Sequence, residues 1–149
     1  MTAEIDALEA VIKLAKADSA LNTITGGRID NRHHYGQDSG DWAQNAQSLV
    51  VFPSGGLPQL YLEAQRTQFE ARCYGDTYFE AGQVLNKLVD FTRHNARRTV
   101  TITAGKALVY FVIVRGQPRQ FMDEDVRPLG GMPAYQVILE AQVAEQIVV

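Results

Sequence analysis

The chain has 149 residues and a formal net charge of -3. This length favours one domain over 1–149, because folding at this size buries roughly 68–70% of the surface of the unfolded chain. A hydrophobic fraction of 46% suits a globular core. The mild acidity gives no indication of a nonspecific nucleic-acid binder, which would need a basic face.

The N-terminal part predicts two helical segments. Residues 3–17 have the apolar spacing of an amphipathic helix, with Thr2 as a plausible N-cap. Glu9 and Lys13 form an i,i+4 pair in the favourable order. Residues 18–27 predict a stop, one short helical turn and a two-glycine exit.

A long loop and two strands follow. Residues 28–47 have no apolar period and are rich in Gly, Asn, Asp and Gln, so we expect a long surface loop at about 30–47. Residues 48–53 form a short apolar strand. After a Gly-Pro turn, residues 59–75 alternate between polar and apolar side chains, which predicts either one strand or two halves separated by a bulge.

After Gly75 the apolar spacing changes from two to three and four, which predicts a helix over 77–94. Thr77 and Glu80 match a capping box. In that motif the Thr77 hydroxyl accepts from the Glu80 N–H, and the Glu80 carboxylate accepts from the Thr77 N–H. Asp76 and Glu80 also place negative charge at the start of the helix, which disfavours an anion site there.

The C-terminal part predicts three strands. Residues 98–103 and 107–116 read as strands joined by a tight connection. The second of these is apolar over most of its length apart from Tyr110, so we expect it to be covered on both faces. Residues 117–133 are predicted as a second long loop, and 134–145 as the last strand.

The predicted order is therefore α-β-β-α-β-β-β. Strands that follow one another along the chain suit antiparallel pairing, so we expect an α+β domain with two helices packed on one face of a mainly antiparallel sheet. In this arrangement Leu85 and Leu88 should be buried against the strand at 108–114.

Phe79 does not fit the apolar side of its helix. At 100° per residue the apolar side holds Ala81, Val84, Leu85, Leu88, Val89, Phe91 and Thr92. Phe79 lies in the middle of the polar side. It either folds back on a nearby loop, as single apolar surface residues often do, or serves as an interface anchor.

The candidates for chemistry are weak. His33 and His34 are adjacent in the first loop, and no His-x-x-x-His or Cys-x-x-Cys spacing accompanies them. Asp123, Glu124 and Asp125 lack the spacing of a calcium loop, so we expect them to be solvated. No phosphate-binding loop, dinucleotide fingerprint or nucleophile elbow occurs. We therefore predict no catalytic, metal or cofactor site, and a protein that is not an enzyme.

Cys73 is the only cysteine, so no disulfide can form within the chain, which fits a reducing compartment. It shares the apolar side of its strand with Phe69 and Ala71, which indicates a small buried hydrophobe. The first ten residues have no apolar run typical of a signal peptide, and no stretch is long enough to span a membrane. We expect a soluble protein that is cytoplasmic where it is made.

Four segments together resemble the tail terminator, or tail completion, proteins of long-tailed bacteriophages. Residues 5–29 look like the family's opening helix, with Ala-Asp-x-Ala-Leu and a Gly-Gly-Arg-Ile exit. Residues 49–54 look like its first strand. Residues 66–91 look like its strand, Tyr-Gly-x-Thr turn and Glu-Ala helix, and residues 134–143 look like its closing strand.

The resemblance implies a structural virion protein. Such proteins form a ring, usually hexameric, at the head-proximal end of the tail tube, where they end tube polymerisation and join the tail to the head. The implied partners are other copies of the chain, the tail tube protein, a head-closure or connector protein, and genomic DNA that passes through the bore without sequence-specific binding. No membrane is involved. The implied location is the virion, and the host cytoplasm during assembly.

The candidate interface residues on this interpretation are Phe79, His33, His34, Tyr35, Trp42, Asp123, Glu124 and Asp125. Two alternatives stay open. One is another neck component, such as a head-closure or connector-adaptor protein. The other is a small metal-dependent hydrolase, which would need the loop with the two histidines to meet carboxylates from 123–125.

Overall fold

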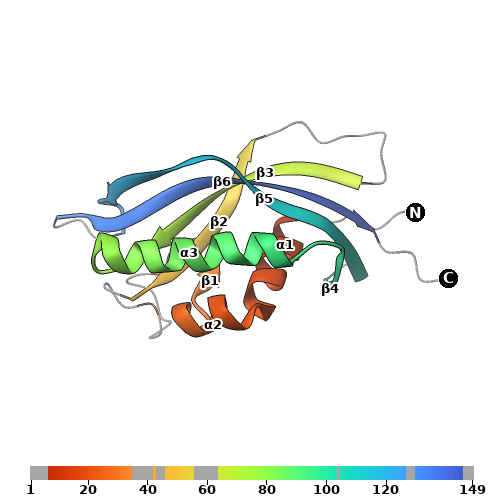
Figure 1. Ribbon diagram of the computed structural model, residues 1–149, viewed down its shortest axis with the longest axis horizontal. Coiled ribbons are helices and arrows are strands. Elements are labelled where there is room, and N and C mark those ends of the chain that lie inside the picture. The colour runs from red at the N-terminus through yellow and green to blue at the C-terminus, as the bar shows by residue number, and fades with distance from the viewer. Residues whose placement is uncertain are drawn as a thin grey trace.

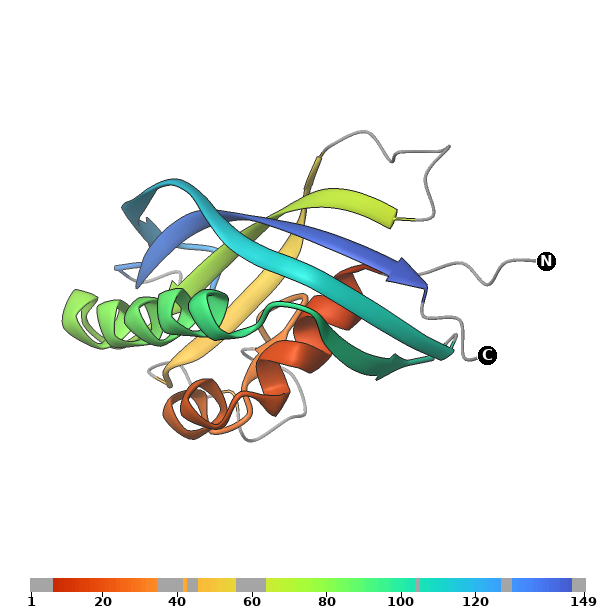
Figure 2. The same ribbon diagram turned by 45° about the vertical axis from the view of Figure 1, so that its right-hand side comes forward.

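A computed structural model of the chain describes residues 7–34, 42, 46–55, 64–103, 105–126 and 130–145. Within these residues, three helices cover one face of a 6-stranded sheet (Figure 1). The turned view shows the helices on that same side of the sheet (Figure 2). The fold is therefore α+β. None of the described helices is both long and apolar enough to cross a membrane.

The helices are α1 (Ala7–Ala17), α2 (Ser19–Thr25) and α3 (Tyr78–His94). In α1 the predicted pair forms, with 3.1 Å between Lys13 Nζ and Glu9 Oε1. The predicted start of this helix, including the Thr2 cap, lies outside the described residues.

The short turn predicted after α1 is a capped helix. The Asp18 carboxylate accepts a hydrogen bond from the Leu21 N–H at 3.0 Å, which begins α2. Gly26 ends it with a φ of 61°, a backbone conformation that favours glycine. Since α2 was predicted only as a turn, the predicted element order omitted it.

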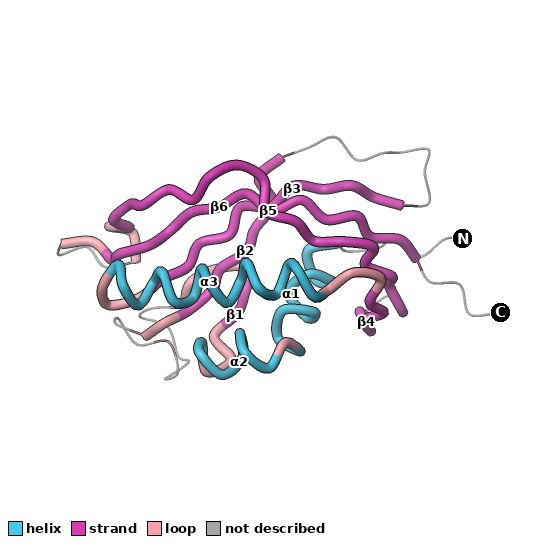
Figure 3. Tube along the Cα trace, viewed as in Figure 1, coloured by secondary structure: helices cyan, strands magenta, loops and turns pink. Residues whose placement is uncertain are grey.

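The sheet has the strand order β1-β2-β3-β6-β5-β4, and Figure 3 shows it as a curled layer above the helices. Neighbouring strands are antiparallel except for β1 and β2, which are parallel. The strands are β1 (Ile29–Asp30), β2 (Ser48–Gly55), β3 (Ala64–Tyr74), β4 (Arg98–Ile102), β5 (Gly105–Asp123) and β6 (Met132–Glu145).

Two predicted boundaries were wrong. The first loop starts later than expected, because Ile29 and Asp30 pair with β2. The second loop, predicted over 117–133, is a strand as far as Asp123, and β6 already begins at Met132. This stretch contains glycine, proline and exposed polar residues, which are untypical of a strand. The strand accommodates them because the pairing of β5 with β6 shifts register between Arg115 and Arg119, as at a bulge.

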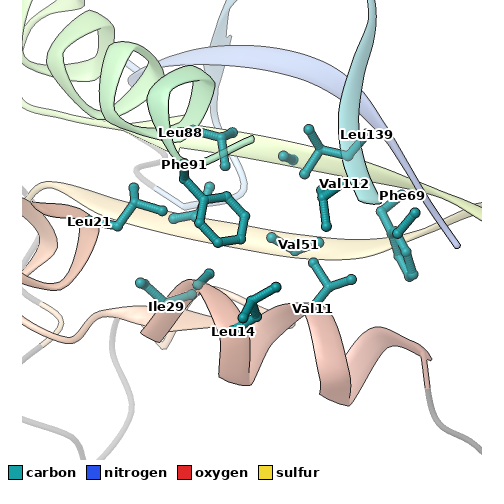
Figure 4. Close-up of a cluster of buried hydrophobic side chains, with 14 of the residues drawn as sticks. Val11, Leu14, Leu21, Ile29, Val51, Phe69, Leu88, Phe91, Val112 and Leu139 are labelled. Carbon is teal, nitrogen blue, oxygen red and sulfur yellow. The ribbon is translucent and has the colours of Figure 1, made fainter. Parts of the chain in front are cut away.

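The core lies between the sheet and the helices. Figure 4 shows Val11 and Leu14 of α1 below Val51 of β2, with Leu88 and Phe91 of α3 above it. Five residues of α3 are buried, all from the predicted apolar side: Ala81, Val84, Leu85, Leu88 and Phe91. The helix contacts β3, β5 and β6, which confirms the predicted burial of both leucines.

Cys73 is also fully buried in this core, as predicted, and burial raises the pKa of its thiol.

The expectation that β5 is covered on both faces was only partly right. Val109 and Val112 are buried on the helix side, but Tyr110 is 39% exposed. It occupies the position where the register shifts between Val109 and Phe111, so it leaves the regular alternation of the strand.

Candidate functional site on the open face of the sheet

We call the side of the sheet away from the helices the open face. Side chains alternate between the two faces along each strand. Where β2, β3 and β5 lie close together, the open face holds a cavity of about 330 Å³. It is lined by Asn31, Arg32, His33, Val50, Phe52, Arg72, Tyr74, Asp123, Asp125 and Val126.

Asp123 is the buried charge of this cavity. It is only 5% exposed. Its Oδ2 accepts from the Tyr74 hydroxyl at 2.6 Å and from Arg72 Nη1 at 3.2 Å, and its Oδ1 accepts from the Asp125 N–H at 3.0 Å. The prediction that Asp123 is solvated was therefore wrong. As the last residue of β5, Asp123 reaches the open face opposite β3 and meets donors there.

Arg72 links this carboxylate to a second one. Its Nε donates to Glu70 Oε2 at 3.0 Å, and Gln136 of β6 donates to the other oxygen of Glu70. The guanidinium also lies over two aromatic rings, 5.0 Å from the centre of Phe52 and 5.1 Å from that of Phe121. Stacking of this kind is favourable for arginine. The network thus joins side chains of β2, β3, β5 and β6.

Tyr74 acts as a hydrogen-bond donor in this network. Burial raises the pKa of its phenol, and the hydrogen bond to Asp123 raises it further, while Arg72 opposes both. At neutral pH the phenol therefore keeps its proton, which it donates to the carboxylate. The group is suited to holding Asp123 in place and not to accepting a proton.

The two histidines have different surroundings. The His33 ring makes edge-on contacts with Trp42 at 4.9 Å and with Tyr74 at 5.1 Å between ring centres. Burial lowers the pKa of His33 to about 4. The negative charge of Asp123 acts in the opposite direction, and His34 lowers the pKa further. His33 is therefore neutral at pH 7. The Nε2 of His34 lies 2.6 Å from Asp30 Oδ2.

The structure thus brings several predicted residues together. His33, His34, Trp42 and Asp123 form one cluster, while Glu124 is exposed nearby. Asp125 is exposed and lines the same cavity. Tyr35 lies outside the described residues.

The cavity also bears on the hydrolase alternative. His33 and Asp123 share it, as that alternative requires. However, three protein donors already use the Asp123 oxygens. Within the described residues, no group of three His, Cys, Asp or Glu side chains is placed to hold a metal ion. These hydrogen bonds make Asp123 part of a structural network.

Sequence reasoning missed Glu70, Arg72, Tyr74 and Gln136. The alternation along β3 placed Glu70 and Arg72 on a polar side, but it did not indicate that this side is partly covered. The covering residue, Asp123, lies 51 positions away from Arg72. Only the strand register of the folded sheet shows that the two meet.

Phe79 lies elsewhere, at the start of α3. It is 75% exposed. The predicted cap is present, because the Thr77 hydroxyl accepts from the Glu80 N–H at 3.2 Å. The return contact is shifted by one residue. Glu80 Oε2 accepts from the Asp76 N–H at 3.0 Å, and not from Thr77 as predicted.

Comparison with known proteins does not connect these features to a family. No protein-family model matches the chain, and no curated protein sequence matches it. The cavity on the open face and the exposed aromatic residue on α3 are therefore the two features from which a function is inferred.

Proposed function

We propose that this chain is a structural subunit of a bacteriophage tail, of the tail terminator type. Copies form a ring, of six subunits, at the head-proximal end of the tail tube. The ring ends tube polymerisation and joins the tail to the head connector. The order of motifs over 5–29, 49–54, 66–91 and 134–143 supports this assignment, since it resembles that family over most of the chain.

The single observation that carries the proposal is the exposure of Phe79. Its side chain extends from the polar side of α3, and 75% of its surface is in contact with solvent. A large aromatic residue in this position is typical of an interface anchor, because aromatic side chains dominate the energetics of protein contacts.

The open-face network supports the same interpretation. Its charges are partly compensated internally, with Arg72 between Glu70 and Asp123. It ties the ends of four strands together, which stiffens the sheet. A stiff subunit suits a protein whose role is to present surfaces to neighbours, since little order has to be gained on assembly.

The test uses purified protein and tail tubes, with capped tubes counted by negative-stain electron microscopy. Phe79→Ala should lower the capped fraction, while the free energy of unfolding of the subunit changes by less than about 1 kcal/mol, because no core packing is lost. Asn86→Ala, two turns further along the exposed side of α3, is the matched control and should cap normally.

Other outcomes would replace the proposal. Rings that bind the head connector but never the tube would indicate another neck component. A monomer that carries stoichiometric zinc, lost in the double variant His33→Ala and His34→Ala, would indicate the hydrolase. A Phe79→Ala variant that melts much earlier than the wild type would place Phe79 in the core and remove the argument for an interface.

A further inference from the structure

Parts of the two edges of the sheet are poorly suited to pairing with another chain. Within the described residues, β4 pairs with only the first part of β5, and the rest of that edge carries a register shift between Arg115 and Arg119. This stretch contains Gly116, with a φ of 77°, and Pro118. On β2 the register shifts after Pro53. Bulges and prolines discourage strand addition along these stretches, which favours contacts between copies through side chains.

The two ends of α3 carry opposite charges. Asp76 and Glu80 flank Phe79 at the start. At the other end, Arg93 and His94 belong to the last turn, and Arg97 and Arg98 follow directly. A helix of 17 residues is about 25 Å long, so these are two separate surfaces of the molecule.

The arginine end keeps positive charge available. Arg93 is 3.7 Å from Asp90, but among the described residues neither Arg97 nor Arg98 has a carboxylate partner. Arg97 adopts a φ of 56°, a left-handed conformation that is strained for a non-glycine residue. Its N–H donates to the Tyr110 carbonyl at 3.1 Å, which holds the backbone of this turn, and its side chain is exposed.

We propose that copies of this chain associate head to tail, with the Phe79 end of α3 in one copy on the arginine end of α3 in the next. The guanidinium groups of Arg97 and Arg98 stack on the Phe79 ring and pair with the acids beside it. This inference rests on the proposed ring function and specifies its subunit contact. Because the two surfaces differ, the contact is heterologous, and a heterologous contact closes into a ring when the rotation between copies allows it.

The first experiment measures self-association by sedimentation velocity over a concentration series. Phe79→Lys adds positive charge to the aromatic end, and the double variant Arg97→Glu and Arg98→Glu reverses the other end. Each should weaken association at least about tenfold. Wild-type association should also weaken between 0.1 M and 1 M salt, because screening shortens from about 10 Å to about 3 Å. Asn86→Lys adds the same charge outside the contact and should associate like the wild type.

The second experiment separates a heterologous contact from a symmetric one. Each variant retains one intact surface, so a mixture of Phe79→Lys with the double arginine variant can form one native contact and no more. Native mass spectrometry should show heterodimers of one copy of each, and no larger species. A symmetric contact would instead stop the wild type at a dimer, because both of its surfaces would be used up between two copies, whereas the heterologous contact lets the wild type grow beyond two copies.

The outcomes distinguish this inference from the proposed function. Rings that persist in both variants, at unchanged concentration, overturn the head-to-tail contact and leave the ring function standing. Open filaments that both variants abolish support the contact and contradict the ring function. A wild-type chain that stays monomeric at all concentrations, and a mixture without heterodimers, each overturn the contact. Equal melting temperatures of all variants show that the effects are not due to unfolding.

Discussion

At the scale of single residues, Asp123 and Glu140 are the buried carboxylates of the described part of the chain. Each meets an arginine on the open face, Asp123 with Arg72 at 3.2 Å and Glu140 with Arg115 at 2.5 Å. Removing either arginine should destabilise the protein by less than the about 3–5 kcal/mol of a fully buried pair, because the Arg72 and Arg115 side chains are 29% and 54% exposed. These pairs therefore restrict which substitutions the open face can accept.

The hydroxyl of Tyr74 is the first feature that a variant can test. Tyr74→Phe removes the donor from Asp123 and leaves the buried ring in place, so the free energy of unfolding should fall by about 1.5–3 kcal/mol in urea titrations. Tyr110→Phe is the matched control, because that side chain is partly exposed, and it should change stability by less than about 0.5 kcal/mol. Equal losses in both variants would contradict the role of the Tyr74 hydroxyl.

The pKa of His33 predicts a dependence of stability on pH. The value is lowered to about 4 in the fold, against an ordinary value of about 6.5. Between these pH values the unfolded chain binds more protons than the folded chain. The free energy of unfolding should therefore decrease as the pH falls from about 6.5 to about 4, and this contribution should level off below that.

His33→Phe tests this dependence, since it keeps an aromatic ring beside Trp42 and Tyr74 but cannot be protonated. Urea titrations from pH 7 to pH 4 should give a flatter curve for this variant than for the wild type. Asn86→Phe places the same ring at an exposed position without a titratable group and should keep the wild-type slope. The same slope in His33→Phe and the wild type would show that the His33 ring is not buried.

At the scale of elements, α3 organises the core. Leu88 is 1% exposed between the helix and the sheet. Leu88→Ala should lower the free energy of unfolding by about 2–5 kcal/mol, through lost burial and the cavity left behind. Lys87→Ala, on the exposed side of the same turn, should change it by less than about 0.5 kcal/mol. A small loss for Leu88→Ala would mean that α3 is not packed on the sheet.

The helix α3 was predicted almost completely because its signals are local, whereas β5 was predicted only in part. The Thr77 cap and the apolar spacing of α3 are properties of neighbouring residues, so the sequence alone contains them. The second half of β5 depends on its partner instead. Arg119 and Gln120 are exposed polar residues that are held in a strand only because β6 pairs with them. Pairing of this kind overrides local preference.

At the scale of the whole molecule, one part of the candidate sites could be predicted from the sequence and another could not. Phe79 could be identified from the sequence, because its place on the polar side depends on a single helix. The network around Asp123 could not, because its members come from four strands and from positions as far apart as Glu70 and Gln136. Alternation shows on which side of a strand a residue lies, and only the strand order shows what it faces.

The position of β6 has a consequence for synthesis on the ribosome. This strand is made after the other described strands, yet it lies in the middle of the sheet, between β3 and β5. Its pairing joins Ala64 to Ala144 and Tyr74 to Ala134. Until those residues leave the exit tunnel, the β2–β3 hairpin has an unpaired edge, and the nascent chain is exposed to premature contacts with its neighbours. The sheet can therefore close only after β6 has been made, which separates the synthesis of this domain from its assembly with other copies.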